Sequence, residues 1–176
     1  MRTRPDLYPP APWNNGPLTL FHGTVLTHWI AIAQDGVRVH RGRAKTDFGV
    51  GFYATADRLQ ATGRAHQVAE RRQDRAIVVW GQLDRDALAS LETLHFVRGH
   101  QSAEDFWSFV YHCRGGATTH GRSLQARPLY DVVVGPVARN YHRRRAYENM
   151  DQISFHTPEA EALLNRITWS AYDPTR

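Results

Sequence analysis

The apolar residues of this chain come in short runs, and this limits the folds open to it. Two of these runs, Ile77–Trp80 and Val132–Val134, have the length of a buried strand. A helix that spans a membrane needs roughly 20 apolar residues in succession. The chain has 176 residues, of which 41% are hydrophobic and 22% charged, which is typical of one globular domain with a core. Disorder, collagen and a coiled coil are therefore excluded as descriptions of the whole chain.

Strand patterns recur along the chain without a regular alternation with helical ones. Strands are expected at residues 18–22, 51–55, 76–83, 93–97, 130–134, 152–155 and 167–172, with a further extended segment at 37–40. Helices are expected to begin at four capping residues, Thr27, Asp57, Ser102 and Thr157. This order predicts an α+β fold rather than a doubly wound sheet.

The first 17 residues are rich in proline and predict an irregular N-terminal arm before a single domain at 18–176. Proline also stands where a signal peptide needs an apolar stretch. Cys113 is the only cysteine, which excludes an intrachain disulfide. We therefore expect a cytoplasmic protein with no membrane partner.

The net charge of +5 comes almost entirely from arginine, because Lys45 is the only lysine among 22 Lys and Arg residues. Basic residues gather at 38–45 and again at 139–145. A guanidinium can donate two parallel hydrogen bonds to a phosphate group, which favours a polyphosphate ligand or a nucleic acid. Arginine-rich codon usage and a solvated surface would produce the same pattern, so both interpretations stay open.

Three segments carry polar groups suited to chemistry. In Phe21–Thr24 a histidine at a strand end precedes a glycine, which would let a ligand approach the backbone. In Thr46–Thr55 two glycines shape a loop before an aromatic strand that could stack on a flat ring. In Asp151–Thr157 the alternation puts Gln152 and Ser154 on one face of a strand. Each segment taken alone has an ordinary structural explanation.

In this order the three segments resemble the ADP-ribosyltransferase superfamily, in the histidine-tyrosine-glutamate branch that includes diphtheria toxin and the poly-ADP-ribose polymerases. The chain is most similar to a bacterial family with an Asp-Phe-Gly-x-Gly-Phe-Tyr segment, which stands here at 47–53, and with glutamine at the third position. The segment 130–138 also fits that family. The resemblance implies two facing antiparallel sheets around an NAD cleft, with helices packed around them.

The resemblance also implies roles for individual residues. His22 would hydrogen-bond the ribose on the adenosine side, and the Gly23 backbone would hold the nicotinamide carboxamide. Tyr53 would stack on nicotinamide, and Gln152 would reach the 2′-hydroxyl of the nicotinamide ribose. The implied catalytic residues are His22, Tyr53 and Gln152, and the implied NAD-binding residues are His22, Gly23, Thr24, Phe48 and Tyr53.

Gln152 stands where the branch often has a glutamate. An amide can fix a ribose hydroxyl, but it carries no negative charge to stabilise an oxocarbenium-like state. Glu148 or Asp151 could supply a carboxylate, although Asp151 should point to the opposite face from Gln152.

The expected function is transfer of ADP-ribose from NAD to a macromolecule, either protein, RNA or DNA, by a bacterial toxin or effector. By analogy, a neighbouring antitoxin or immunity protein is also expected. The alternatives are an NAD glycohydrolase toxin, with water as acceptor, and a catalytically weak module that binds NAD or nucleic acid.

Histidines are dense enough to raise the question of a zinc site. The candidate ligands are His95, His100, His112, Cys113 and His120. Their spacing fits no standard zinc pattern, and Cys113 falls on the apolar face of the predicted helix that follows Ser102. No metal is therefore expected, and no phosphate-binding P-loop or dinucleotide-fold glycine motif is present.

Overall fold

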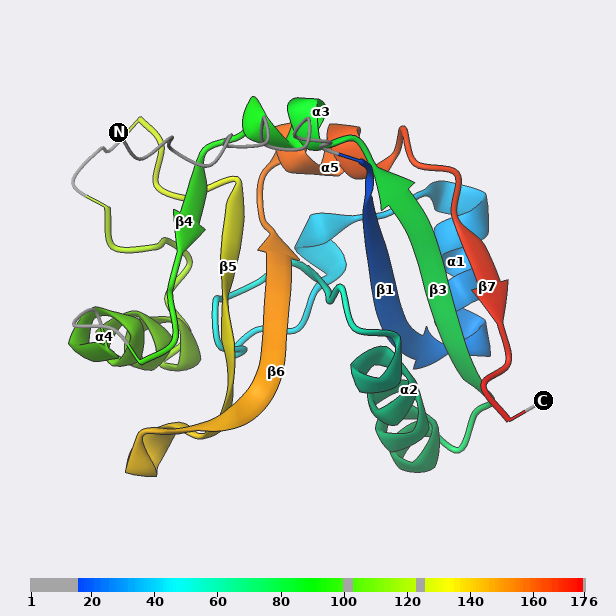
Figure 1. Cartoon of the computed structure of the whole chain (residues 1–176), viewed down its shortest axis with the longest axis horizontal. Helices are drawn as coiled ribbons and strands as arrows, with labels where there is room; N and C mark the ends of the chain where they lie inside the picture. The colour runs from blue at the N-terminus through cyan, green and yellow to red at the C-terminus, as the bar shows by residue number, and fades with distance from the viewer. Residues whose placement is uncertain (1–15, 100–102, 123–125, 176) are drawn as a thin grey trace, which may run out of the picture.

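The computed structural model of the protein describes residues 16–99, 103–122 and 126–175. Within these ranges the chain forms an α+β fold with two sheets (Figure 1). The strands are β1 (Leu18–Val25), β2 (Phe52–Ala54), β3 (Ala76–Leu83), β4 (Thr93–His95), β5 (Val132–Asn140), β6 (Arg145–Phe155) and β7 (Ser170–Tyr172). The helices are α1 (Leu26–Asp35), α2 (Arg58–Arg72), α3 (Arg85–Ala89), α4 (Ala103–Arg114) and α5 (Pro158–Leu164), with short 3-10 turns η1 (Val39–Arg41) and η2 (Tyr141–Arg143).

The two sheets lie side by side in Figure 1 and have the strand orders β1-β3-β7 and β2-β6-β5-β4. The three-stranded sheet is antiparallel, as is the pairing of β2 with β6 and of β6 with β5. The expectation of antiparallel sheets throughout is wrong for β4, which pairs with β5 in parallel. Because α4 lies between these two strands in the chain, it serves as the crossover connection that a parallel pair requires.

The main hydrophobic core lies on one face of both sheets. It takes Leu20 from β1, Phe52 from β2 and Phe155 from β6, and α5 covers it with Leu163 and Leu164. The opposite face is covered by two helices. There α2 packs on the three-stranded sheet through Ala61 and Ala65, and α4 packs on the four-stranded sheet in an aromatic cluster around Phe48.

Most of the predicted elements are confirmed, and the errors have local causes. Asp57 and Thr157 cap α2 and α5 as expected, because their side chains accept backbone N–H groups of the first turn. Thr27 does not cap α1, which begins one residue before it and follows Val25 without a side-chain cap. The segment at 37–40 is not simply extended, since η1 begins at Val39.

Several expectations concern residues outside the described ranges. Residues 1–15 of the predicted arm, the capping residue Ser102 and His100 all lie there. In the described part of the chain, no helix has both the length and the apolar character needed to cross a membrane.

Candidate functional site

The strands β1 and β2 touch at one point and then separate. Phe21 and Thr55 exchange two backbone hydrogen bonds of 2.8 and 2.9 Å, which form an isolated antiparallel bridge between the two sheets. Backbone direction alternates along a strand, so the N–H and C=O of Gly23 also point toward β2. No backbone hydrogen bond joins Gly23 to β2 in the described structure, although Gly23 is buried. A buried N–H and C=O pair without a partner is uncommon and marks this gap as a candidate ligand contact.

Gly23 has a second, structural requirement on its other side. A Cβ atom built there would lie 2.0 Å from the Ala61 carbonyl oxygen and 2.7 Å from the Ala65 nitrogen, both in the backbone of α2. Helix α2 therefore occupies the space above Gly23, which the sequence had suggested would admit a ligand. The N–H and C=O of Gly23 can still contact a ligand in the plane of the sheet, whereas the space above its Cα is filled by α2.

The His22 side chain lies beside the gap between β1 and β2. Its Nδ1 is 2.6 Å from the Tyr53 carbonyl oxygen, which can only accept, so Nδ1 carries the proton. Burial lowers the pKa of His22 to about 4, so the ring is neutral at pH 7. Nε2 is then an acceptor, and the described residues provide it with no hydrogen-bond donor. The ring itself packs against Phe52, with centroids 4.5 Å apart.

The Tyr53 side chain is held by the loop that precedes β2. Its hydroxyl donates to the Gly49 carbonyl (2.8 Å) and accepts the Phe48 N–H (3.0 Å). The Thr46 hydroxyl oxygen is 2.7 Å away. Burial raises the pKa of Tyr53, which keeps it a neutral phenol. The ring is half-buried, and its hydroxyl is committed to the fold rather than free for a ligand.

Gln152 belongs to a polar network around Asp47. Its Nε2 donates to Asp47 Oδ2 (2.8 Å) and to the Pro136 carbonyl (3.1 Å). Asp47 is buried and also accepts from Arg114 Nε (2.9 Å) and from the Ala138 N–H (2.9 Å). Because both partners of Nε2 are acceptors, the network fixes the orientation of the amide. Oε1 faces away from these acceptors and receives no hydrogen bond from the described residues.

The structure brings Tyr53 and Gln152 to one face, which we call the tyrosine face. Tyr53 pairs with Ser154, and Gln152 lies two residues earlier on the same side of β6. The His22 ring lies on the opposite face, beside Phe52, and meets Tyr53 only at its backbone. The expected cleft shared by all three side chains is therefore not formed, and the β1–β2 gap lies between the two groups.

Two further expected NAD-binding side chains are enclosed by protein. Phe48 is fully buried among the rings of Phe96, Phe106 and Phe109. Thr24 is buried, and its hydroxyl is 3.1 Å from His28 Nδ1. Both side chains therefore support the fold in this structure and reach no opening.

Asp47 and Arg114 are the site residues that sequence reasoning missed. Asp47 stands in the segment Thr46–Thr55, where an acidic residue among glycines and aromatic residues could have indicated a role in the site. No sequence signal indicates Arg114, because it lies 67 residues from Asp47 in the chain. Asp151 points away from Gln152 as expected and pairs with Arg98 at 2.7 Å.

Replacing Tyr53 by phenylalanine is expected to destabilise the protein. The change removes the acceptor of the Phe48 N–H and the donor to Gly49, which should reduce the free energy of unfolding by about 1–3 kcal/mol. Urea unfolding measures this loss. Tyr172→Phe is the matched control, because the buried Tyr172 hydroxyl has no partner among the described residues and its removal should cost nothing. Equal stability of the two variants would contradict this role of the Tyr53 hydroxyl.

Three histidines, the part-buried His22 and the buried His120 and His156, predict a loss of stability in mild acid. Burial lowers the pKa of His22 and His120 to about 4 and that of His156 to about 3, from 6.5. As pH falls below 6.5, the unfolded chain binds protons that the folded protein does not. The free energy of unfolding should therefore fall between pH 6.5 and 5, by up to about 1.4 kcal/mol per pH unit for each histidine.

Urea unfolding across this pH range tests the expectation, because most carboxylates stay ionised there. The His156→Gln variant should show a shallower dependence on pH than the native chain. His66→Gln, at an exposed position of α2, should leave the slope unchanged. A free energy of unfolding that is constant from pH 6.5 to 5 would show that these histidines are not held neutral.

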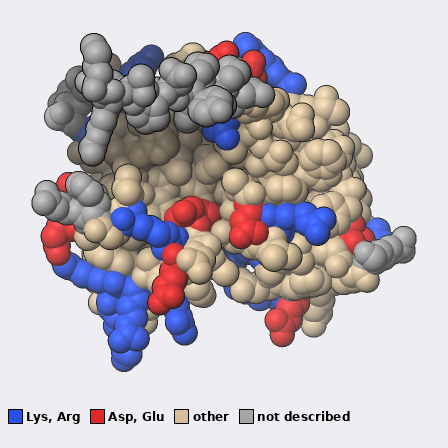
Figure 2. Space-filling view, viewed as in Figure 1, with Lys and Arg blue, Asp and Glu red and all other residues tan. Residues whose placement is uncertain are grey.

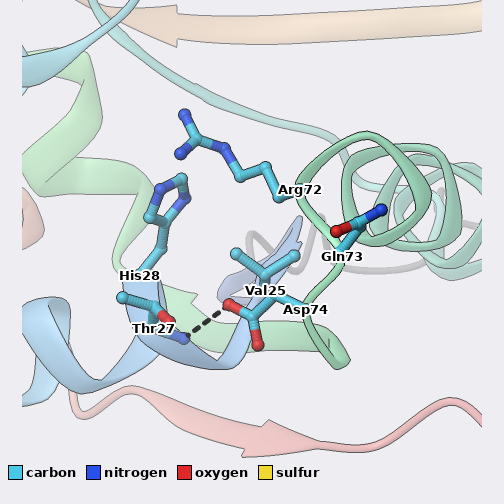
Figure 3. Close-up of a pocket in the computed structure, with 6 residues that line it drawn as sticks. All are labelled: Val25, Thr27, His28, Arg72, Gln73 and Asp74. Carbon is cyan, nitrogen blue, oxygen red and sulfur yellow. Dashed lines mark hydrogen bonds between the residues drawn. The ribbon is translucent and has the colours of Figure 1, made fainter.

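Two hollows lie near these strands. One of about 360 Å³ lies where β1 runs into α1, and its lining includes His28, Arg72 and Asp74 (Figure 3). Asp74 is already engaged there, since it accepts the Thr27 N–H at 3.2 Å. The other, of about 370 Å³, lies beside β6 and includes Asp151 and Gln60. The amide oxygen of Gln60 is buried and has no hydrogen-bond partner among the described residues.

The histidines and cysteine weighed as zinc ligands do not assemble in the described parts of the chain, where no group of three or more His, Cys, Asp or Glu side chains could hold a metal ion. His120 uses both ring nitrogens, one with the Phe48 carbonyl and one with the Tyr130 N–H. Burial raises the pKa of Cys113 to about 12, so its thiol stays protonated at neutral pH.

Comparison with curated proteins gives no significant match. Residues 18–147, from the first residue of β1 into β6, match the family described as "Protein of unknown function (DUF3990)". The matched span includes His22, Asp47 and Tyr53 and ends before Gln152. Because this span is well over half of the chain, the protein belongs to that family.

Proposed function

We propose that the protein is an NAD-dependent ADP-ribosyltransferase with the fold of that superfamily. The observation that carries the proposal is the gap between β1 and β2, where the Gly23 N–H and C=O are buried and unpaired within the described structure. The nicotinamide carboxamide has one acceptor oxygen and an NH₂ donor. It can therefore accept from the Gly23 N–H and donate to the Gly23 carbonyl.

The neighbouring groups suit the rest of such a ligand. Among the described residues, His22 Nε2 has no hydrogen-bond donor, and it lies beside the gap, where it can accept a hydrogen bond from a ribose hydroxyl. The Tyr53 ring and the Gln152 carbonyl oxygen lie on the tyrosine face, where one can contact a flat ring and the other can accept a hydroxyl. His22 then acts on one side of the gap and Gln152 on the other.

The chemistry requires orientation more than proton transfer. The bond between nicotinamide and C1′ of the ribose breaks, and nicotinamide leaves with the electron pair. An oxygen or nitrogen atom of the acceptor forms the new bond to C1′ and loses its proton to solvent. With water as acceptor the same steps release ADP-ribose. Fixed donors and acceptors around the ribose would favour this step by holding its geometry.

Nicotinamide release tests the proposal directly. The full chain incubated with labelled NAD should release nicotinamide, with label on a macromolecule for transfer or in free ADP-ribose for hydrolysis. Benzamide should raise the melting temperature, whereas benzoate should not, because a carboxylate cannot donate to the Gly23 carbonyl and faces it with a negative charge. The proposal would be rejected if the chain released no nicotinamide and neither NAD nor benzamide raised its melting temperature.

Two substitutions of His22 separate its two nitrogens. Asparagine reaches the Nδ1 position and can still donate to the Tyr53 carbonyl, so His22→Asn should keep the melting temperature. It should weaken NAD binding about three- to tenfold, as expected for one lost hydrogen bond. Glutamine reaches the Nε2 position, so His22→Gln should lose stability more than NAD affinity. If His22→Asn binds NAD as tightly as the native chain, His22 does not contact the ligand.

A further inference from the structure

The outer parts of β5 and β6 form an exposed, arginine-rich ribbon with η2 at its tip. We call residues 139–147 the basic ribbon; they contain four arginines and neither aspartate nor glutamate. The ribbon extends from the lower left of the molecule in Figure 1. Lys and Arg side chains gather in the same region of the surface in Figure 2. Such a protruding basic surface attracts polyanions.

The charges of the ribbon are largely free of protein partners. Arg143 and Arg145 are exposed and form no ion pair among the described residues. Arg144 pairs with Glu104 at 2.6 Å. The other basic segment, residues 38–45, has more of its charge paired, because Arg38 pairs with Glu161 and Arg41 with Asp35. The ribbon therefore holds the stronger uncompensated positive charge of the two.

Aromatic rings lie between these arginines. The Arg139 guanidinium lies 5.8 Å from the centroid of the Tyr147 ring, and Arg114 lies 5.2 Å from that of Tyr141. Tyr111 packs against Tyr141, with centroids 5.5 Å apart. Tyr111 and Tyr147 remain 38% and 37% exposed. The surface thus offers cations and flat rings together.

We propose that the basic ribbon binds single-stranded nucleic acid. Arginine supplies contacts to phosphate, and exposed tyrosine rings supply stacking surfaces for unpaired bases. A duplex hides the faces of its bases and would use only the arginines. An acidic polypeptide has no bases for the rings to stack on. The combination on this ribbon therefore fits a single strand best.

The position of the ribbon connects it to the candidate site. Strand β6 begins in the ribbon at Arg145 and continues to Gln152, so both lie on one strand. The bound polymer would then be the class of acceptor for the transfer reaction, an addition that rests on the proposed function. Binding itself requires no NAD and is tested without it.

The test uses fluorescence anisotropy with a labelled 20-nucleotide single strand of mixed sequence, as DNA and as RNA, and with the matching DNA duplex. The native chain should bind at least one single strand more tightly than the duplex. Arg143→Gln with Arg145→Gln should weaken binding at least tenfold and reduce the slope of log affinity against log salt by about 1.4, for two lost phosphate contacts. Tyr147→Leu should weaken binding about fivefold or more, whereas Tyr147→Phe should not.

The control Arg58→Gln with Arg166→Gln removes the same charge from exposed positions away from the ribbon and should retain binding. Equal losses in this control and in the ribbon variant would overturn the proposal, because net charge alone would then explain binding. Tighter binding to the duplex, or no effect of Tyr147→Leu, would overturn it as well. Since NAD is absent throughout, these outcomes are separate from failure of the transferase proposal.

Discussion

Replacing Gln152 by glutamate is expected to destabilise the protein by about 3 kcal/mol at pH 7. Gln152 Nε2 lies 2.8 Å from Asp47 Oδ2, so a carboxylate at position 152 would face a second carboxylate in a buried site. Two carboxyl groups at this distance in a buried site cannot both remain ionised. The Arg114 guanidinium already donates to Asp47, so the glutamate must hold a proton or leave the site.

The pH dependence of this loss identifies its cause. A glutamate whose pKa is raised in the folded state contributes a loss of stability that begins near pH 4.3 and grows as pH rises toward the folded pKa. Urea unfolding should therefore show that Gln152→Glu loses little free energy of unfolding relative to the native chain at pH 4.5 and much more at pH 7. Gln82→Glu makes the same change at an exposed strand position and should lose little at either pH. A pH-independent loss in Gln152→Glu would contradict this explanation.

A second variant tests the pair directly. Asp47→Asn can donate to a glutamate at position 152, so the double variant Asp47→Asn with Gln152→Glu should recover part of the stability that Gln152→Glu loses.

The network around Asp47 also explains why a glutamine stands at position 152. The branch that the sequence resembles often has a glutamate at this position. The Asp47 carboxylate instead requires a donor here, which an amide supplies and an ionised glutamate does not.

Gly23→Ala is expected to cost at least about 3 kcal/mol of unfolding free energy. The new methyl group would lie 2.0 Å from the Ala61 carbonyl oxygen and 2.7 Å from the Ala65 nitrogen. Both atoms belong to the helix backbone, so no side-chain rotation relieves the contact. Helix α2 would have to move away from β1 and expose the small core cluster of Ala61, Ala65 and Val78.

Gly63→Ala provides the matched control within the same helix. No neighbouring atom of the described residues lies within 4 Å of a Cβ at Gly63, and alanine favours a helix over glycine by about 1 kcal/mol. This variant should therefore be more stable than the native chain, and urea unfolding compares the two. If Gly23→Ala were tolerated equally well, the close contact between β1 and α2 would not exist in solution.

Local sequence patterns predicted most helices and strands well, because the formation of a helix or strand depends largely on residues near one another in the chain. The apolar run at 76–83 forms β3 at the predicted bounds. Asp57 and Thr157 cap helices because a capping side chain bonds to the backbone two or three residues later. Burial on α2 does not follow side-chain hydrophobicity, since Leu59 is 74% exposed and the small residues Ala61 and Ala65 are buried. Close helix approach at Gly23 selects those small residues, and sequence periodicity alone does not reveal it.

That Gln152 and Ser154 share a strand face could be predicted from the sequence, because the backbone of a strand alternates with a period of two. What those faces contact depends on how distant segments pack. Asp47 and Gln152 are 105 residues apart in the chain, and their hydrogen bond depends on how β6 lies against β5 and on the path of the loop before β2. His22 and Tyr53 were expected to share a cleft, yet their side chains lie on opposite faces, because the Phe21–Thr55 bridge places Tyr53 on the face of Phe21 and His22 on the other. Strand alternation is a property of the local backbone, whereas the partner of each polar group is set by packing between distant segments.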